Sequence, residues 1–210
     1  MYMTFRATVL AAAAVFGGSI AHASAIDFTD ASAYGVSITQ TSATTLTGTA
    51  AGGWTGATTG GPINLSEAGP GAQSAFVAGD NDGLGIGDDE ISVDPTESFT
   101  ISFNTTVTIA GLYFLDHYAP EEVHVSIDGG TPLAPFISTV SPPTPGYTEF
   151  ENLSLTGQTF TFTVGEPNQT GAVADYALAG IDIAAIPLPA GLLLLGGALG
   201  MLGATRRRKA

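Results

Sequence analysis

Residues 98–110 read SFTISFNTTVTIA, and this stretch decides the fold class. From Phe99 to Phe103, aromatic and aliphatic side chains alternate with threonine and serine. An alternation with a period of two is typical of a strand that buries one face. A turn is expected at Asn104 and Thr105, after which the alternation resumes. The stretch therefore predicts two half-buried strands rather than a helix.

Residues 121–128, with the sequence EEVHVSID, alternate in the same way and end at a predicted turn over residues 128–130. Residues 112–118 form another apolar segment just before them. Ala119 and Pro120 lie between the two segments, so we expect a hairpin with a short loop there.

Further strands are expected in the rest of the chain, because β-branched and aromatic residues recur in short runs separated by glycine, proline, asparagine and aspartate. These runs are Tyr34–Thr39, Ala43–Thr49, Ser74–Ala78, Tyr147–Leu155, Thr159–Val164 and Ala172–Ile183. About ten short strands at regular spacing favour an all-β, two-sheet antiparallel sandwich of the jelly-roll kind. The chain has no cysteine, so disulfides cannot contribute to its stability.

The N-terminal segment has the features of a secretory signal peptide. Arg6 is followed by a short apolar run and then by Ala21-His22-Ala23, a small-x-small cleavage pattern. The run is too short to span a bilayer. We therefore expect residues 1–23 to be a signal peptide that is removed after Ala23, with cleavage after Ala25 as the alternative.

The region of residues 24–185 is strongly acidic and is expected to form the folded domain outside the cytoplasm. It contains all 19 Asp and Glu residues and neither Lys nor Arg, so its side-chain net charge is −19. Nucleic-acid binding is excluded, because contacts to phosphates need cationic side chains. The carboxylates must be solvated, hydrogen-bonded, protonated or bound to metal cations.

The C-terminal segment is predicted to cross a membrane. Residues 183–205 carry no charge and are long enough to reach across a bilayer core. Pro187 and Pro189 favour a helix that begins near Pro189, which leaves about 16 residues to Thr205, a length typical of a processed tail or a short anchor in a thin membrane. Four basic residues then follow together: Arg206, Arg207, Arg208 and Lys209. By the positive-inside rule this basic stop stays in the cytoplasm, which leaves the acidic domain on the outer side.

The same segment carries a recognisable motif. Ile186, Pro187, Leu188, Pro189 and Ala190 precede the Leu/Gly-rich run and the basic end. Residues 186–210 thus resemble the VPLPA variety of the PEP-CTERM sorting signals, with Ile in place of the first Val. The resemblance implies a sorting motif, a transmembrane helix and processing by an exosortase, a membrane transpeptidase of Gram-negative bacteria that make exopolysaccharide. The acidic region is also similar to the β-sandwich ectodomains that such sorted proteins carry.

One loop has the composition of a calcium site. Residues 79–91 read GDNDGLGIGDDEI. Calcium takes six to eight oxygen ligands from carboxylates and from backbone carbonyls in tight turns. The candidate ligands are Asp80, Asp82, Asp88, Asp89 and Glu90. The spacing does not match an EF-hand, and a solvated acidic turn is the alternative interpretation.

Two further sets of side chains could form sites. His117 and His124 bracket Glu121 and Glu122, so a metal site made of two histidines and a carboxylate is conceivable if the hairpin forms. Trp54, the only tryptophan, lies in a glycine-rich segment and could stack on a sugar ring or serve as a packing anchor.

The sequence therefore predicts an exported, non-enzymatic surface or matrix protein associated with exopolysaccharide or biofilm. The C-terminal anchor holds it in the inner membrane, with its domain in the periplasm, until an exosortase-type enzyme processes it for the cell surface or the medium. The alternative is a carbohydrate-binding module, and a surface glycosidase with paired carboxylates comes after it. No nucleophile elbow, phosphate loop or dinucleotide motif is present.

Overall fold

A computed structural model describes residues 24–30, 33, 35–65, 83–88, 90–93, 96–141, 146–165 and 174–184. The predicted signal peptide, sorting motif, transmembrane helix and basic stop lie outside these residues. Among the described residues, none belongs to a helix that is long and apolar enough to cross a membrane. Residues 22–186 form one compact unit with its own core.

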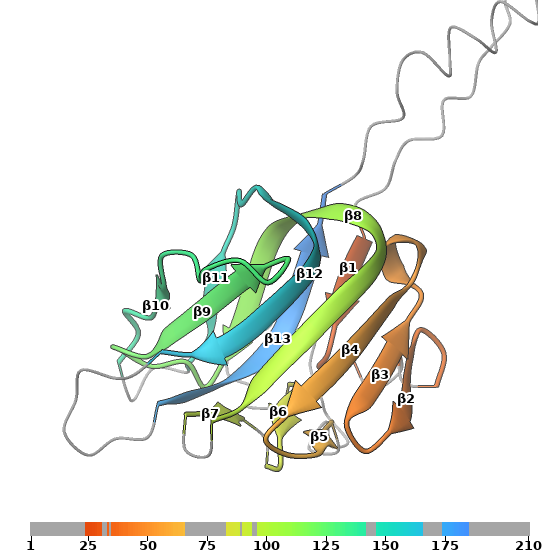
Figure 1. Cartoon of the computed structure of the whole chain (residues 1–210). Helices are drawn as coiled ribbons and strands as arrows, with labels where there is room; N and C mark the ends of the chain where they lie inside the picture. The colour runs from red at the N-terminus through yellow and green to blue at the C-terminus, as the bar shows by residue number, and fades with distance from the viewer. Residues whose placement is uncertain are drawn as a thin grey trace, which may run out of the picture. The chain divides into compact units, whose positions relative to one another are not determined.

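The predicted all-β class is confirmed for the described part of the chain (Figure 1). A 3₁₀ turn, η2 (Ala50–Gly52), lies between β3 and β4. The strands are β1 (Ser24–Asp27), β2 (Ile38–Ser42), β3 (Thr45–Gly48), β4 (Trp54–Thr59), β5 (Ile63–Asn64), β6 (Gly85–Ile86), β7 (Ile91–Ser92), β8 (Ser98–Leu115), β9 (Glu122–Ile127), β10 (Phe136–Ile137), β11 (Thr148–Phe150), β12 (Leu155–Val164) and β13 (Asp175–Ile183).

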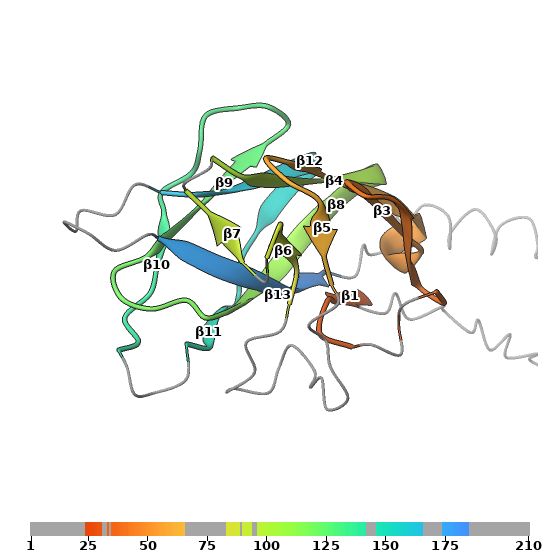
Figure 2. The same cartoon turned by 90° about the horizontal axis from the view of Figure 1, so that it is seen from below.

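Eleven strands form one sheet, and β5 and β6 form a second, two-stranded sheet. The pairings along the main path run β10-β9-β12-β8-β4-β3-β2, while β13 joins β8 to β1 and β7. Figure 2 shows that this sheet folds into two layers, with β9, β12, β4 and β3 in one and β13, β1 and β11 in the other. The antiparallel pairing is therefore confirmed, whereas the likeness to a jelly roll stays a prediction.

Strand β8 links the two layers, and here the expected turn at Asn104 and Thr105 is wrong. The strand continues for 18 residues. Its first part pairs with β4 and β12, and its last part pairs with β11 and β13. Asn104, Thr105 and Thr106 are exposed where the strand passes between the layers. The backbone N–H of Asn104 donates to the Gly53 carbonyl at 3.0 Å, so pairing continues at this bend.

The expected hairpin around Ala119 and Pro120 is also wrong. Strand β9 pairs with β12 and β10 and not with β8. The end of β8 belongs to the layer of β13, whereas β9 belongs to the layer of β12. Residues 116–121 therefore connect the two layers.

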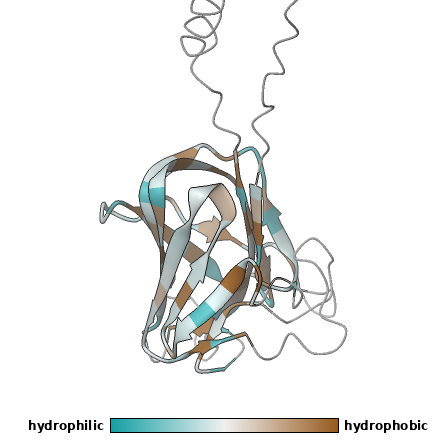
Figure 3. Cartoon of the chain, turned by 90° about the vertical axis from the view of Figure 1, so that its right-hand side faces the viewer, coloured by the Kyte–Doolittle hydropathy of each residue, from teal (hydrophilic) through white to brown (hydrophobic). Residues whose placement is uncertain are grey.

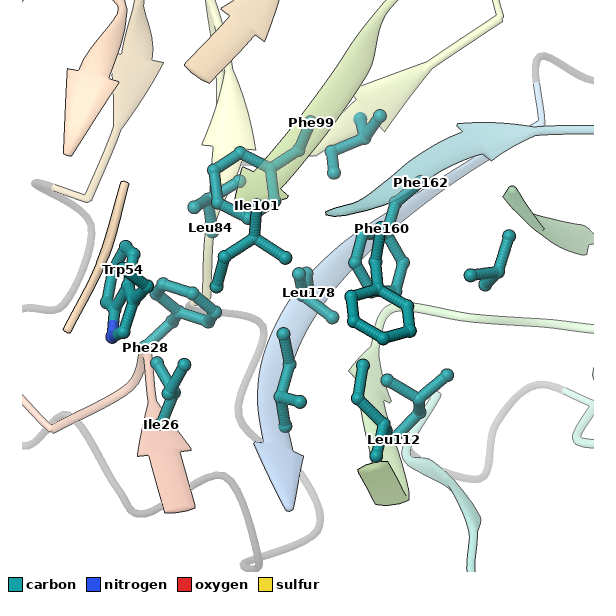
Figure 4. Packing of buried hydrophobic residues seen from close by; sticks show 14 of the residues in the cluster. Ile26, Phe28, Trp54, Leu84, Phe99, Ile101, Leu112, Phe160, Phe162 and Leu178 are labelled. Atoms are coloured by element: carbon teal, nitrogen blue, oxygen red, sulfur yellow. The ribbon is translucent and has the colours of Figure 1, made fainter. Parts of the chain in front are cut away.

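The core lies between the layers and is rich in phenylalanine (Figure 4). The ring of Phe28 packs edge-on against Trp54 and Phe99, with centroids 6.1 and 5.9 Å apart. Phe99 in turn stacks on Phe162 at 6.4 Å. Hydrophobic positions alternate with polar ones along the strands in Figure 3, as the sequence pattern predicts.

The two ends of the described domain lie side by side. In the antiparallel pair of β1 and β13, Ser24 lies opposite Ile183, and Ile183 lies opposite Ile109 beside the bend of β8. Asp175 begins the nine-residue strand β13 and lies at its other end. At about 3.3 Å per residue, these two ends of the strand are roughly 27 Å apart.

Candidate functional site

Four carboxylates meet at the end of the domain opposite Ser24 and Ile183, and we call this set the acidic end. Its members are Glu90, Asp116, Glu121 and Asp175. Glu90 lies just before β7, Asp116 just after β8 and Glu121 just before β9. Asp175 is the first residue of β13. The pairing of β7 with the start of β13 brings Glu90 next to Asp175. Asp116 has a left-handed backbone, with a φ of 50°.

Three pairs of these carboxyl groups share hydrogen bonds. The Glu90 side chain forms hydrogen bonds with those of Asp116 and Asp175, and the Glu121 side chain forms one with Asp175. A carboxylate has only acceptor oxygens, so two carboxyl groups form a hydrogen bond only when one of them is protonated. The arrangement thus retains protons at a pH where isolated carboxyl groups have lost them.

Burial is the main cause of this proton retention. Desolvation raises the pKa of Glu90 well above its usual range, and the neighbouring charges of Asp116 and Asp175 add to the effect. Desolvation also raises the pKa of Glu121 to about 8, with further contributions from Asp175 and Asp116. The backbone N–H of Tyr118 donates to the Glu121 carboxylate and opposes the rise. No Lys or Arg is present in residues 24–185 to offset these repulsions.

A buried histidine supports the loop that carries two of these carboxylates. His117 is fully buried, and its ring contacts Phe114 and Tyr176 edge-on. Its Nε2 lies 3.0 Å from the Glu121 carbonyl oxygen, and its Nδ1 lies 2.7 Å from Thr148 Oγ1. Since a carbonyl only accepts, Nε2 carries the proton and Nδ1 accepts from the hydroxyl. Burial lowers the pKa of His117 to about 4, so the ring is neutral at pH 7.

The metal site considered around His117 and His124 does not form. Both ring nitrogens of His117 are used inside the domain, whereas His124 contacts Glu122 through Nε2 at 3.3 Å on the partly exposed side of β9. Within the described part of the chain, no group of three or more His, Asp or Glu side chains is placed to hold a metal ion.

The predicted calcium loop is described only in part. Asp80, Asp82 and Asp89 lie outside the described residues. Asp88 is exposed, and its Oδ1 accepts from the backbone N–H of Glu90 at 3.3 Å. Glu90 turns out to belong to the acidic end. Calcium binding by this loop stays a prediction.

Trp54 lies within the core rather than on an open loop. Only 3% of its surface is exposed, because the indole packs against Phe28 and over Gly48 and Gly56. A Cβ built on Gly48 would lie 2.1 Å from the ring, so a glycine is needed at this close approach. The ring thus has no open face for a sugar in the structure as described, and the stacking role stays a prediction.

Comparison with known proteins adds little to this description. No protein-family model and no curated protein matches the chain. One solved structure with local likeness is a complex described as CpGH89CBM32-5 from Clostridium perfringens with GalNAc-beta-1,3-galactose, at 17% identity and a TM-score of 0.31, over 50% of this chain and 85% of the other. Another is CBM32-3 from a family 31 glycoside hydrolase of the same organism, at 14% identity and a TM-score of 0.30, over 52% and 72%. At these scores the likeness assigns neither a fold family nor a ligand.

Proposed function

We propose that this protein is an exported, non-catalytic surface module that is tethered to the cell envelope by its C-terminal segment and is then sorted by a transpeptidase. The observation that carries the proposal is the pairing of Ser24 with Ile183. It brings the residue after the predicted signal-peptide cleavage next to the last residue of β13, three residues before the sorting motif at Ile186–Ala190. A domain tethered by this end presents its opposite end to the surroundings.

The tail is proposed as the substrate of an exosortase-type enzyme. Pro187 and Pro189 disfavour a helical backbone just before the apolar run, so we expect an extended motif, as a protease-like active site requires. The basic stop, Arg206–Lys209, holds the chain in the membrane until cleavage. The membrane and the transpeptidase are therefore the first partners of the protein, and exopolysaccharide is the partner proposed for the sorted domain.

The acidic end is the part of the domain that such a tether presents outward. The acidic end is part of a domain whose side-chain net charge is −19. This net charge favours solubility and repels other negatively charged molecules. A role in binding anionic polymers is disfavoured for the same reason. Among exopolysaccharides, those without a net negative charge are therefore the proposed partners of the domain.

Two matched cysteine variants test the display of the domain on the cell. The natural chain has no cysteine, so each variant carries a single thiol. Thr96 is exposed next to the start of β8, and Thr105 is exposed at the bend near Ser24. We expect a bulky, membrane-impermeant maleimide to label Thr96→Cys faster than Thr105→Cys, which lies closer to the tether, on spheroplasts whose outer membrane has been removed. The rates should become equal once the protein is released.

The controls decide between this proposal and its alternatives. Labelling of both variants only after lysis of the spheroplasts would place the domain in the cytoplasm and contradict the proposal. Equal rates on spheroplasts and after release would contradict the proposed orientation of the tethered domain.

A further inference from the structure

Five adjacent strands of the main sheet are free of charged residues. These strands pair in the order β12-β8-β4-β3-β2 and lie side by side in Figure 1. None of them contains Asp, Glu, His, Lys or Arg, so all 19 acidic residues of the chain lie outside them. Where their buried positions alternate with exposed ones, the exposed positions are mostly threonine and serine. We call this surface the hydroxyl face, and it is uncharged although the domain as a whole is strongly acidic.

The strand register aligns the side chains of the hydroxyl face in rows that cross the strands. The first row consists of Thr39, Thr47, Thr55, Ser102 and Thr159, each directly opposite the next. The second row, two residues further along the strands, consists of Thr45, Ala57, Thr100, Thr161 and Ser126 of β9. All ten side chains are exposed or partly exposed. Since neighbouring strands are about 4.8 Å apart, each row is roughly 19 Å long.

Hydrogen bonds between strands orient hydroxyl groups in both rows. Thr100 Oγ1 lies 3.0 Å from Thr161 Oγ1, and Ser102 Oγ lies 3.2 Å from Thr159 Oγ1. A hydroxyl has one donor and two acceptor sites, so each of these groups can still bond to a ligand after pairing. The β-branched threonine side chain is also stiff, so little side-chain freedom is lost when a ligand binds. The rows are therefore ordered before a ligand arrives.

We propose that the hydroxyl face binds one chain of an extended, β-1,4-linked neutral glycan along a row, with one sugar residue per strand. This inference rests on the proposed function and deepens it by naming the ligand class. A sugar ring presents hydroxyl groups at its edge and C–H groups on its faces, which match the hydroxyl and methyl groups of threonine. One residue of such a glycan advances by nearly one strand spacing. Successive sugars therefore meet successive members of a row.

The chemistry of the hydroxyl face disfavours other occupants. An anionic glycan is repelled by the side-chain net charge of −19, and a cationic one finds no carboxylate in either row. Protein partners, including a second copy of this chain, anchor on buried aromatic or arginine side chains, and the rows contain neither. A flat crystalline surface meets few strands at once, because adjacent strands are rotated by roughly 20–25°. A single flexible chain can follow this twist along the whole row.

The dependence of affinity on glycan length tests the row geometry. Cello-oligosaccharides from the disaccharide to the hexasaccharide are titrated calorimetrically into the mature protein, which is kept in a detergent without a sugar head group. We expect the affinity to rise with each added glucose up to about five residues, the number of strands that a row crosses, and then to level off. Malto-oligosaccharides, which coil, should show no such rise. Oligogalacturonides should bind more weakly, because the domain repels anions.

Two double variants separate binding from folding. Thr100→Val with Thr161→Val removes a hydroxyl pair but keeps the shape of both side chains, so neither hydroxyl is left unpaired and the fold should persist. Binding of cellopentaose should weaken about tenfold. The matched control is Thr108→Val with Thr156→Val, which removes another pair, 2.9 Å apart, from the same two strands but outside the rows. The control should bind cellopentaose as the natural protein does.

The proposal is overturned if no cello-oligosaccharide binds, if cellobiose binds as tightly as cellopentaose, or if the two double variants lose affinity equally. Self-association that Thr100→Val with Thr161→Val abolishes, without glycan binding, would assign the face to a second copy and also overturn it. Labelling of Thr96→Cys on spheroplasts does not depend on these hydroxyl groups. Failure here is therefore distinguishable from failure of the proposed function.

Discussion

The clearest test of the acidic end is the replacement of Glu121 by Gln. The natural domain must keep a proton on Glu121 at pH 7, because the pKa of this side chain is raised from 4.5 to about 8 by burial. The unfolded chain has no such requirement. A raised carboxyl pKa gives stability that is fully present below pH 4.5 and is lost as the pH rises toward 8.

The size of this effect follows from the shift. At about 1.36 kcal/mol per pKa unit, a shift from 4.5 to about 8 corresponds to about 5 kcal/mol at face value. Glu121 is only partly buried, so solvent screening reduces this figure, and we expect about 1–2 kcal/mol. Glu121→Gln removes the need for proton uptake, and its amide oxygen can still accept from the Tyr118 N–H. The variant should therefore be more stable at pH 8 by about 1–2 kcal/mol, or roughly 3–6 °C in Tm.

Thermal unfolding of residues 22–186 at pH 4.5, 6 and 8, followed by circular dichroism, measures this difference. Glu151→Gln is the matched control, because it removes the same charge from an exposed position and reports the general relief of repulsion. The gain for Glu121→Gln should exceed that of the control at pH 8 and vanish at pH 4.5. A gain that is equal at both pH values, or a loss at pH 8, would refute the reasoning about proton sharing at the acidic end.

Three further perturbations have defined outcomes. His117→Gln should lower stability at pH 7, because it removes two buried hydrogen bonds. The loss in urea midpoint relative to the natural protein should shrink toward pH 4.5. The reason is that the lowered pKa of His117 gives stability that is fully present above pH 6.5 and is lost as the pH falls toward 4. Phe99→Ala should cost about 3–5 kcal/mol in urea unfolding at pH 7, since Phe99 is fully buried, and a cost below 1 kcal/mol would contradict the described core. Calcium should raise Tm more than magnesium does at equal ionic strength, because a ligand at 100 times its Kd stabilises the folded state by about 2.7 kcal/mol. The double variant with Asp80→Asn and Asp82→Asn should abolish this difference. An equal response to both ions would favour the solvated turn.

The fold class could be predicted because it depends on a local pattern. The alternation around Phe99 and Val123 is visible in the sequence and describes which side chains face the core. The length of β8 could not be predicted, because Asn104 to Thr106 are polar and exposed both in a turn and in a bend of a continuous strand. Only the pairing of β8 with distant strands distinguishes the two.

The predicted hairpin partner of β9 is wrong for a similar reason. Segments adjacent in sequence favour a hairpin, but the buried ring of His117 and its hydrogen bond to the Glu121 carbonyl stabilise a connection between layers. Sequence spacing alone does not report that the ring is buried among aromatic side chains.

The acidic end could be predicted only in part. Glu90 stood out because it lies in an acidic, glycine-rich loop. The other three members, Asp116, Glu121 and Asp175, are single acidic residues at strand boundaries, where charged residues commonly face solvent. Their convergence depends on the pairing of β7 with β13 and on the connection after β8, which are long-range features of the fold.

The mass of the intact mature protein tests the central claim most directly, when it is measured for protein from the cell envelope and for protein from the medium. We predict a chain that begins at Ser24, lacks Arg206–Lys209 and ends near Pro187–Ala190, with any added mass on that new C-terminus. A mature chain that retains Arg206–Lys209 in both fractions would contradict sorting and leave a plain membrane anchor. A chain that retains residues 1–23 would contradict the predicted removal of the signal peptide.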